Sequence, residues 1–308
     1  MTFTIYGIAY LAVIIFVSAV LFRIVSYISK PMHVRWELYP VAHEGERASY
    51  GGGYLEEVDW WEKEREKSLI GELIYMIKEI LFLKAVWENN RTLWYQTYAF
   101  HIGIYLSAAS LLLLLLAAIL KIANFGYETI IINLINIICP IGMIAGIIGA
   151  VSLFLRRIYD ASLRNYSSFE HFFNLFIFIL TMILVLINWG WIDPSFAMAI
   201  GFITSIITFT PAPIENVFFT LQVLMASFLI AYIPLTHMSH FFMKYFLYHD
   251  IRWGDEPNVN NPKTESKINV VLNYNVSWSA PHIAGHGRNT WAEVATFNPM
   301  AEPEKKKE

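Results

Sequence analysis

The sequence has 308 residues, of which 56% are hydrophobic and only 15% are charged, with a formal net charge of -3 at pH 7. Soluble globular domains carry about 25% charged residues, so this composition favours a membrane protein. The charge gives no sign of a nucleic-acid partner. The single cysteine, Cys139, excludes an internal disulfide and an iron–sulfur cluster held by this chain alone.

The first apolar segment runs from Ile5 to Ile28 and is too long for the core of a signal peptide. We therefore expect residues 1–28 to form a retained transmembrane helix. Residues 29–92 are rich in charged side chains and are expected to form a cytoplasmic loop. Within this loop, the stretch Leu69–Trp87 mixes Lys and Glu with Leu, Ile and Phe. This pattern predicts an interfacial amphipathic helix that is too polar to span the membrane.

Four further apolar runs are long enough to cross a hydrocarbon core about 30 Å thick, which requires about 20 helical residues. They are Leu93–Leu120, Ile130–Leu155, Phe172–Trp191 and a run from Val217 to about Tyr248. The run Phe196–Phe209 is apolar but short, and prolines lie on both sides of it. Its length favours a re-entrant or interfacial segment. If it spans instead, the chain has six membrane helices and both termini lie on the same side.

The distribution of Lys and Arg predicts the orientation, because cytoplasmic connections carry an excess of both. The connections 29–92 and 156–170 are basic, whereas 121–129 carries one Lys and 192–216 carries neither residue. We therefore expect a multi-pass protein of the cell membrane with its N-terminus outside and its C-terminus in the cytoplasm. The polar residues 249–308 are too poor in apolar side chains for a core of their own. We expect them to form an extended cytoplasmic C-terminal tail that docks on a partner subunit.

The sequence thus predicts an all-α membrane protein. The expected architecture is a bundle of about five transmembrane helices with an interfacial amphipathic helix and the extended tail. Residues 93–248 would form a four-helix bundle that follows the first helix and the loop.

Three histidines lie inside the predicted spans: His101 in the second, and His237 and His240 in the fifth. An ionisable side chain inside a membrane is costly, so each one is a functional hypothesis. Two neutral imidazoles can fill both axial positions of a b-type haem, which favours electron transfer over oxygen chemistry. His101 and His240 each lie about eight residues from the cytoplasmic end of a helix, at matching depth. His237 lies one turn deeper and remains a competing ligand.

A structural interpretation of these histidines stays open, because a histidine inside a membrane can simply form a hydrogen bond with a neighbouring helix. We expect a structural role for His171, which lies at the mouth of the fourth helix, where a polar side chain costs little.

Two further sets of residues have both a functional and a structural interpretation. The first set would pair with haem propionates at the cytoplasmic edge, or would simply anchor the helices: Arg156, Arg157 and Arg164. The second set lies at the outer ends of the second and third helices and would bind a quinone head group, or would belong to an interfacial belt: Lys121, Tyr127 and Glu128.

Two segments resemble a known family. Phe100–Ile104 looks like the F-H-I-G-I segment of the gamma subunit of respiratory nitrate reductase, and Ile233–His240 resembles that family's F-P-F-T-x-x-x-H ending of the fifth helix. The resemblance implies that His101 and His240 are the iron ligands of a haem b. This haem would lie on the side nearer a cytoplasmic partner.

Other segments are similar to a narrower branch of that family. They are His33–Pro40, Tyr54–Trp61, Lys244–Phe246 with His249, and Val276–His282. The branch contains the membrane cytochrome subunits of the sulfite-reductase-linked (DsrM) and heterodisulfide-reductase-like complexes of sulfate reducers. This resemblance implies that the chain is an electron-transfer subunit of a multi-protein respiratory complex in the sulfite reduction pathway. Electrons would pass between menaquinol, formed from menaquinone, and a cytoplasmic iron–sulfur subunit resembling heterodisulfide reductase.

The sequence departs from the family pattern at the second pair of haem ligands. Leu111 and Gln222 stand at those positions. Leucine cannot bind iron and glutamine is not a usual haem ligand, so we predict one haem in place of two. The alternative function is a haem-free membrane anchor that recruits a soluble redox subunit. A transporter is disfavoured, because the sequence has no internal repeat.

Overall fold

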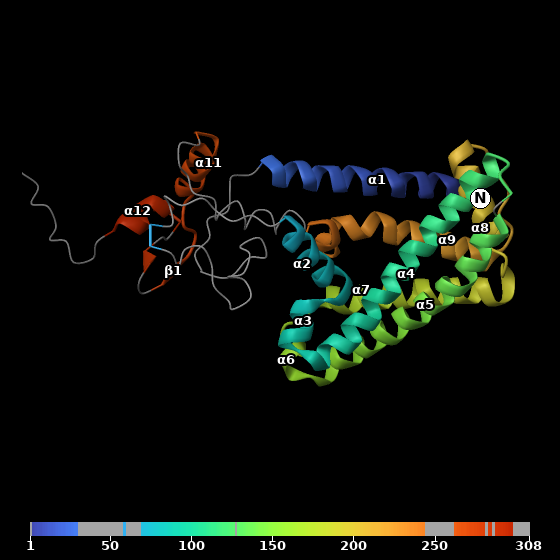
Figure 1. The fold of residues 1–308 in the computed structure, drawn as a ribbon, viewed down its shortest axis with the longest axis horizontal. Coiled ribbons are helices and arrows are strands. Elements are labelled where there is room, and N and C mark those ends of the chain that lie inside the picture. The colour runs from blue at the N-terminus through green and yellow to red at the C-terminus, as the bar shows by residue number, and fades with distance from the viewer. Residues whose placement is uncertain are drawn as a thin grey trace, which may run out of the picture. The chain divides into compact units, whose positions relative to one another are not determined.

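The computed structural model describes residues 2–29, 58–59, 69–126, 128–243, 262–280, 283–284 and 287–297. The predicted fold class is confirmed. The protein is an all-α membrane bundle, and the described residues include five helices that are long and apolar enough to cross a membrane (Figure 1). The chain divides into two compact units. Met1–Leu21 and Leu73–Ser239 form the first unit, and Phe22–Glu72 and His240–Glu308 form the second.

Four of the five spanning helices contain the apolar runs that the sequence predicted, and the fifth contains the first part of its predicted run. The five helices are α1 (Thr2–Ser29), α4 (Arg91–Ile122), α5 (Glu128–Tyr159), α7 (Phe169–Ile187) with the π-helix η3 (Asn188–Ile192), and α9 (Val217–Tyr232) with the 3-10 turn η4 (Ile233–Leu235). Long apolar runs form helices in a membrane because only a helix satisfies every backbone polar group within one segment.

The short helix α8 (Ala197–Thr208) lies between the fourth and fifth spans. Its 12 residues cover about 18 Å at 1.5 Å per residue, which is too short to cross the membrane. The prediction of a short, non-spanning segment here is therefore confirmed. Two residues with left-handed backbone bound the helix: Phe196 with φ 55° and Phe209 with φ 56°. The carboxylate of Asp193, which is buried, accepts hydrogen bonds from the first amides of α8, at 2.9 Å from Met198 N.

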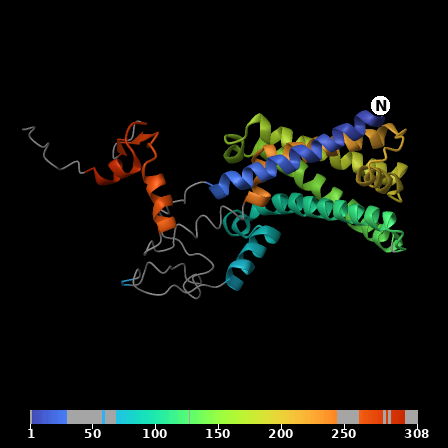
Figure 2. The same cartoon turned by 90° about the horizontal axis from the view of Figure 1, so that it is seen from above.

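The N-terminal half of α1 lies beside α8 (Figures 1 and 2). Two tyrosines of α1 bond to α8 and to the segment after it. The Tyr10 hydroxyl donates to the carbonyl of Ile206 at 3.0 Å. The Tyr6 side chain is only 2% exposed, its hydroxyl accepts from Ala212 N at 3.3 Å, and its ring lies 4.8 Å from that of Phe202. Ile206 is in the last turn of α8, where carbonyls lack an ordinary helical partner. The tyrosines therefore supply polar partners to the end of a short helix.

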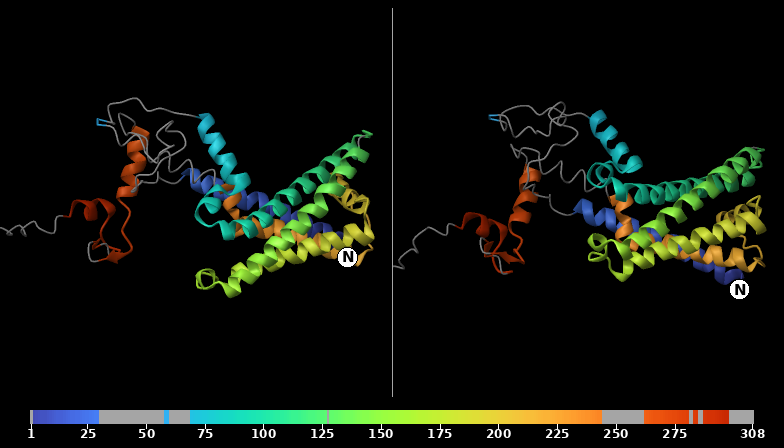
Figure 3. Two further views of the ribbon diagram at one scale, coloured as in Figure 1. Left: turned by 60° about the horizontal axis from the view of Figure 1, so that its bottom comes forward. Right: turned by 90° about the horizontal axis from the view of Figure 1, so that it is seen from below.

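Helices α4 and α5 run side by side and cross at a patch of glycines (Figures 1 and 3). A Cβ atom added at Gly103 would lie 2.3 Å from Gly146 Cα, and one at Gly149 would lie 2.2 Å from Phe100 N. Small residues allow helix backbones to approach closely, which is a common way to pack helices in membranes. This crossing fixes the part of α4 that carries His101.

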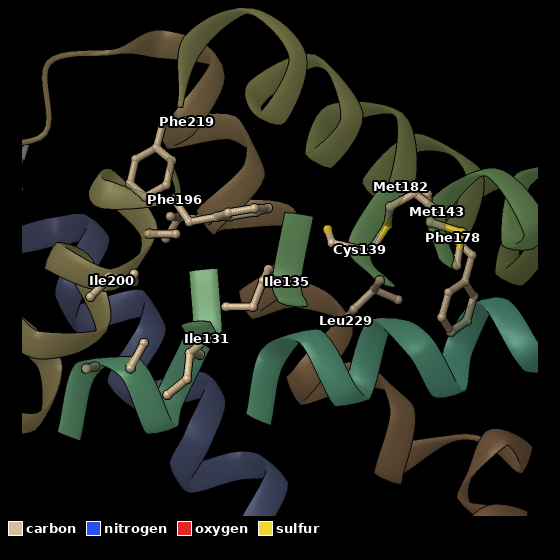
Figure 4. Close-up of a cluster of buried hydrophobic side chains, with 14 of the residues drawn as sticks. Ile131, Ile135, Cys139, Met143, Phe178, Met182, Phe196, Ile200, Phe219 and Leu229 are labelled. Atoms are coloured by element: carbon tan, nitrogen blue, oxygen red, sulfur yellow. The ribbon is translucent and has the colours of Figure 1, made fainter. Parts of the chain in front are cut away.

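The buried core of the first unit joins side chains from α5, α7, α8 and α9 (Figure 4). Ile135 is fully buried, Phe219 is 4% exposed and Met182 is 3% exposed. Cys139 belongs to this cluster and is buried. The core thus holds α5, α7, α8 and α9 together.

The amphipathic segment forms two helices instead of one. They are α2 (Leu69–Phe82) and α3 (Lys84–Asn89), and Leu83 separates them with a left-handed backbone at φ 51°. Side chains of α4 hold the end of α2: Trp94 Nε1 donates to Phe82 O at 2.7 Å, and the Tyr105 hydroxyl donates to Ile80 O at 2.5 Å.

The prediction that the fifth helix continues from Val217 to about Tyr248 is wrong after Leu235. Thr236 has an extended backbone with φ -110° and ψ -177°, and a separate 3-10 turn, η5 (His237–Ser239), follows it. Pro234 explains the break, because proline has no N–H to continue the helical hydrogen bonds. The end of the predicted span, residues 244–248, lies outside the described residues.

The described part of the C-terminal tail is not wholly extended. It forms α11 (Pro262–Leu272), the antiparallel pair β1 (Ser279–Ala280) and β2 (Ile283–Ala284), and α12 (Trp291–Thr296). Val276 is 1% exposed, and the rings of Trp278 and Trp291 lie 6.4 Å apart. A few aromatic contacts thus give local structure to a segment that is poor in apolar residues.

Candidate functional site

His101 lies within α4 and is partly buried, one turn after Thr97. Its Nδ1 is 2.8 Å from the Thr97 carbonyl oxygen. A carbonyl only accepts, so in the neutral imidazole Nδ1 carries the proton and Nε2 carries the lone pair. Histidines that bind metals are commonly held in this way, with the second nitrogen donating to a backbone carbonyl or a carboxylate. The chemistry of the His101 side chain therefore fits an axial ligand.

His237 lies in η5, beyond the end of the spanning helix. Its Nδ1 is 3.0 Å from Glu170 Oε1, and the two side chains are 53% and 47% exposed. Its ring centroid is 5.5 Å from that of His171. His237 therefore joins the start of α7 to the segment that follows α9. As with His101, the bond at Nδ1 favours the tautomer with its lone pair on Nε2.

His171 is the third residue of α7 and bonds to Ser168, the N-cap residue of that helix. Its Nδ1 accepts from Ser168 N at 3.1 Å and lies 2.9 Å from the Ser168 hydroxyl oxygen. This reciprocal arrangement is a capping box in which histidine takes the usual place of Glu or Gln. The contact agrees with the structural role that we expected for this residue.

Arg156 and Arg157, at the end of α5, contact protein groups. Arg156 donates to Gln96 Oε1 at 2.9 Å and to Thr92 Oγ1 at 3.1 Å, and forms an ion pair with Asp160 at 3.3 Å. Arg157 donates to Ser167 Oγ at 2.8 Å. These bonds tie α5 to the start of α4 and to the loop before α7. A role for the two arginines toward haem propionates stays a prediction.

Asp160 also caps the short helix α6 (Ala161–Arg164), since its side chain accepts from Ser162 N at 3.0 Å. The bond from the Ser162 hydroxyl, with smaller contributions from the Ser162 amide and Arg156, lowers the pKa of the Asp160 carboxyl. Arg164 is exposed in the last turn of α6. Its predicted role at a propionate is untested.

His240 follows η5 and is exposed. It belongs to the second compact unit, whereas His101 belongs to the first. The pairing of His101 with His240 across one haem therefore stays a prediction. The break at Thr236 does remove the argument that both residues lie at matching depth in continuous helices.

The residues predicted to bind a quinone are only partly described. Lys121 is exposed in the last turn of α4. Tyr127 lies outside the described residues, and Glu128 begins α5 with its side chain outside them. At the two positions that depart from the family pattern, Leu111 is 50% exposed, and Gln222 has a buried Oε1 atom without a hydrogen-bond partner.

Sequence reasoning missed several polar contacts inside the bundle. The Tyr232 hydroxyl donates to Asn174 Oδ1 at 2.9 Å, joining α9 to α7. Trp189 Nε1 donates to Asn136 Oδ1 at 2.7 Å, joining η3 to α5. Asparagines inside apolar runs were the available signal, because a polar side chain in a span needs a partner.

Among the residues that the structure describes, no three His, Cys, Asp or Glu side chains gather closely enough to hold a metal ion by themselves. No protein-family model, no characterised protein and no solved structure matches this chain.

Proposed function

We propose that the chain is a membrane b-type cytochrome subunit that passes electrons between menaquinol and a cytoplasmic iron–sulfur subunit. The observation that carries the proposal is His101, an imidazole inside a spanning helix whose Nδ1 is bonded to the Thr97 carbonyl. That bond favours the tautomer that ligates iron, and the cost of an ionisable group in a membrane implies a function.

His101 and His240 would hold the haem, as the resemblance to nitrate reductase gamma subunits implies. When bound, a haem with two imidazole ligands supplies one-electron transfer and leaves no open position for oxygen. The chain contributes the position of the ligands, the tautomer of His101 and the low-dielectric surroundings of α4. His237 is the competing second ligand, since its bond to Glu170 favours the same tautomer.

The proposed partner is a cytoplasmic subunit resembling heterodisulfide reductase, within a larger respiratory complex. Support for it comes from the resemblance alone. The loop at 29–92 and the tail at 249–308 are the proposed docking segments.

Haem quantitation tests this proposal. The purified protein is expected to carry about one b-type haem per chain, with a reduced-minus-oxidised absorbance band and a single midpoint potential in a redox titration. His101→Ala and His240→Ala should each lose the haem, while His237→Ala, the matched control three residues away, should retain it. Full haem in His240→Ala with loss in His237→Ala would reassign the second ligand.

The second candidate function is a haem-free membrane anchor. It is favoured by the contacts of His171 and His237, which show that histidines in this bundle can serve structural roles. A wild-type protein that folds and recruits its partner but lacks any reduced b-type band would establish the anchor and reject the cytochrome.

A further inference from the structure

Helix α2 carries a stripe of apolar side chains that remain exposed. The stripe consists of four residues, each between 43% and 58% exposed: Leu73, Ile74, Ile77 and Leu81. Successive members are one, three and four positions apart, so they lie on one face of the helix. This spacing is typical of the face that an amphipathic helix buries against a partner.

The opposite face of α2 forms a contact within the chain. Glu79 lies about 200° round the helix from Ile77, at about 100° per residue. Its carboxylate accepts a hydrogen bond from Ala85 N at 2.9 Å, which closes the corner between α2 and α3. Lys78 is exposed and lies between the two faces. The polar face is therefore used at the corner, and the apolar stripe faces away from it.

The end of α2 is held beside α4, a helix long and apolar enough to span the membrane (Figure 1). Trp94 Nε1 donates to Phe82 O at 2.7 Å, and the Tyr105 hydroxyl donates to Ile80 O. Helix α4 has 32 residues, whereas about 20 are enough to cross the hydrocarbon core. Its first turn, which begins with Arg91 and includes Trp94, therefore lies near the membrane surface, and α2 ends at that level.

Aromatic rings around this point also mark a membrane surface. The ring of Trp87 in α3 lies 4.8 Å from that of Trp94, and the ring of Tyr98 stacks on Trp94 at 4.5 Å. The guanidinium of Arg91 lies 4.8 Å from the Trp87 ring centroid. Trp and Tyr are enriched where headgroups meet hydrocarbon, and basic side chains accompany them there. An apolar stripe exposed at this level meets lipid.

We propose that α2 lies along the membrane surface with the stripe inserted among the lipid acyl chains. The bilayer is the partner that fits, because the spanning helix beside which α2 ends is itself bounded by lipid. The amphipathic pattern predicted an interfacial segment over Leu69–Trp87. The inference limits the inserted helix to α2 and assigns its lipid face to four side chains.

The charges near the stripe are balanced. Lys78 lies next to Glu79 in the chain, and Lys84 pairs with Glu88 at 3.6 Å. Apolar contact and not attraction to anionic headgroups therefore drives the insertion. Helix α2 is then unavailable to a protein partner, which narrows the docking surface proposed within residues 29–92. The inference goes beyond the proposed function, because a haem-free anchor would insert α2 in the same way.

Spin labelling of the full chain in lipid nanodiscs tests the proposal. The buried Cys139 is replaced by Ala, and single cysteines then carry a nitroxide. Ile77→Cys reports on the stripe, and Lys78→Cys is the matched control one residue away. Leu111→Cys, at a position 50% exposed within α4, is the lipid reference, and Glu88→Cys, at a side chain 57% exposed in α3, is the water reference.

Collisions of the label with oxygen, which concentrates in lipid, and with a water-soluble nickel chelate report its depth. At Ile77→Cys we expect frequent oxygen collisions and few nickel collisions, as at Leu111→Cys, with the label about 5–10 Å into the boundary between headgroups and acyl chains. At Lys78→Cys the label should lie closer to water and collide more often with nickel. Leu73→Cys and Leu81→Cys, one turn to either side, should match Ile77→Cys and carry the test if that variant does not fold.

Two outcomes would overturn the proposal. Frequent nickel collisions at the stripe would show that it faces water and is open to a protein partner. Few collisions with either reagent would show that another segment of this chain or a second copy covers it. Haem absorbance of the same samples bears only on the proposed function, so the two proposals can fail separately.

Discussion

The two ends of the bundle treat their polar side chains differently. At the end where α5 finishes and α7 begins, Arg156, Arg157 and His237 each bond to a residue of another helix or loop, and His171 bonds to the cap residue of its own helix. Asn174, in the early part of α7, keeps a buried Nδ2 atom without a partner. At the end where α7 passes into η3, Asn188 has a buried oxygen without a partner. Polar groups that are paired hold helices together, whereas an unpaired buried group lowers stability.

This difference separates polar groups that join helices from buried polar atoms that lack a hydrogen-bond partner. The bonds of Arg156 and Arg157 join α5 to α4 and to the loop before α7, so these residues carry a structural role. The unpartnered oxygens of Asn188 and Gln222 lower the stability of the chain. Four experiments can break or sharpen the comparison.

The largest change in unfolding free energy is expected at the glycine crossing of α4 and α5, where a side chain would clash with the facing backbone. Gly103→Ala should destabilise the protein by about 3 kcal/mol or more, because the new Cβ would lie 2.3 Å from Gly146 Cα and neither backbone can move freely. Gly201→Ala in α8 is the matched control at the other end, since nothing lies within 4 Å of its added Cβ. It should stabilise its helix by about 0.5–1 kcal/mol. Unfolding by SDS in mixed micelles measures both, and equal changes would contradict the close crossing.

The next effect compares the two ends directly. Arg156→Met removes bonds to Gln96, Thr92 and Asp160 and should cost about 1–2 kcal/mol of unfolding free energy. Gln222→Met removes an unpartnered buried oxygen and should be neutral or stabilising by up to about 1 kcal/mol. A large loss of stability in Gln222→Met would show that its amide is satisfied within the protein.

A smaller effect is expected at the contact between Glu170 and His237, which lie 3.0 Å apart. Both side chains are about half exposed, so solvent screens the pair and Glu170→Gln should change the unfolding free energy by about 0.5 kcal/mol or less. The difference in unfolding free energy between variant and wild type should shrink further as salt is raised from about 0.05 to about 0.5 M, because salt screens interactions between exposed charges. A loss that does not depend on salt would indicate a hydrogen bond that is not ionic.

The smallest effect concerns pH and Asp160. The folded chain lowers the pKa of this carboxyl below its ordinary value of 3.8, chiefly through the Ser162 hydroxyl. The cap is therefore fully stabilising above pH 3.8 and is lost as the pH falls through the lowered value. Hydrogen-exchange protection of the Ser162 amide should decline in that acidic window, and in Asp160→Asn it should not vary with pH. An equal decline in both proteins would assign the change to another group.

The sequence predicted the membrane part of the fold well, because each span is a long apolar run that has few alternatives in a bilayer. Its errors fall at helix ends and breaks. The stop at Thr236 had a visible signal in Pro234, but prolines are tolerated inside membrane helices, as Pro140 within α5 demonstrates. The break at Leu83 had no signal, since a left-handed leucine is set by tertiary contacts and not by its own preference.

The candidate site was only partly predictable. His101 stood out because histidine is rare in an apolar run, and the structural role of His171 followed from its place at a helix start. The π-helix at Asn188 was not predicted. Its hydrogen bonds join residues i and i+5, and contacts with the neighbouring helix decide whether they form. Asn188 obtains a partner from Phe218 O on α9, which no pattern within its own segment reveals.

The tyrosine contacts of α1 have a consequence for the order of biogenesis. Tyr10 and Ile206 are 196 residues apart, so the first helix waits about 10–40 s in the bilayer at ordinary translation rates before α8 emerges. Helix α8 is too short to insert as a span of its own, and one of its final carbonyls relies on the hydroxyl of Tyr10. The first helix is thus in place before the segment that packs on it, and a chain made without it would leave Ile206 O with only the long bond from Phe209 N at 3.4 Å.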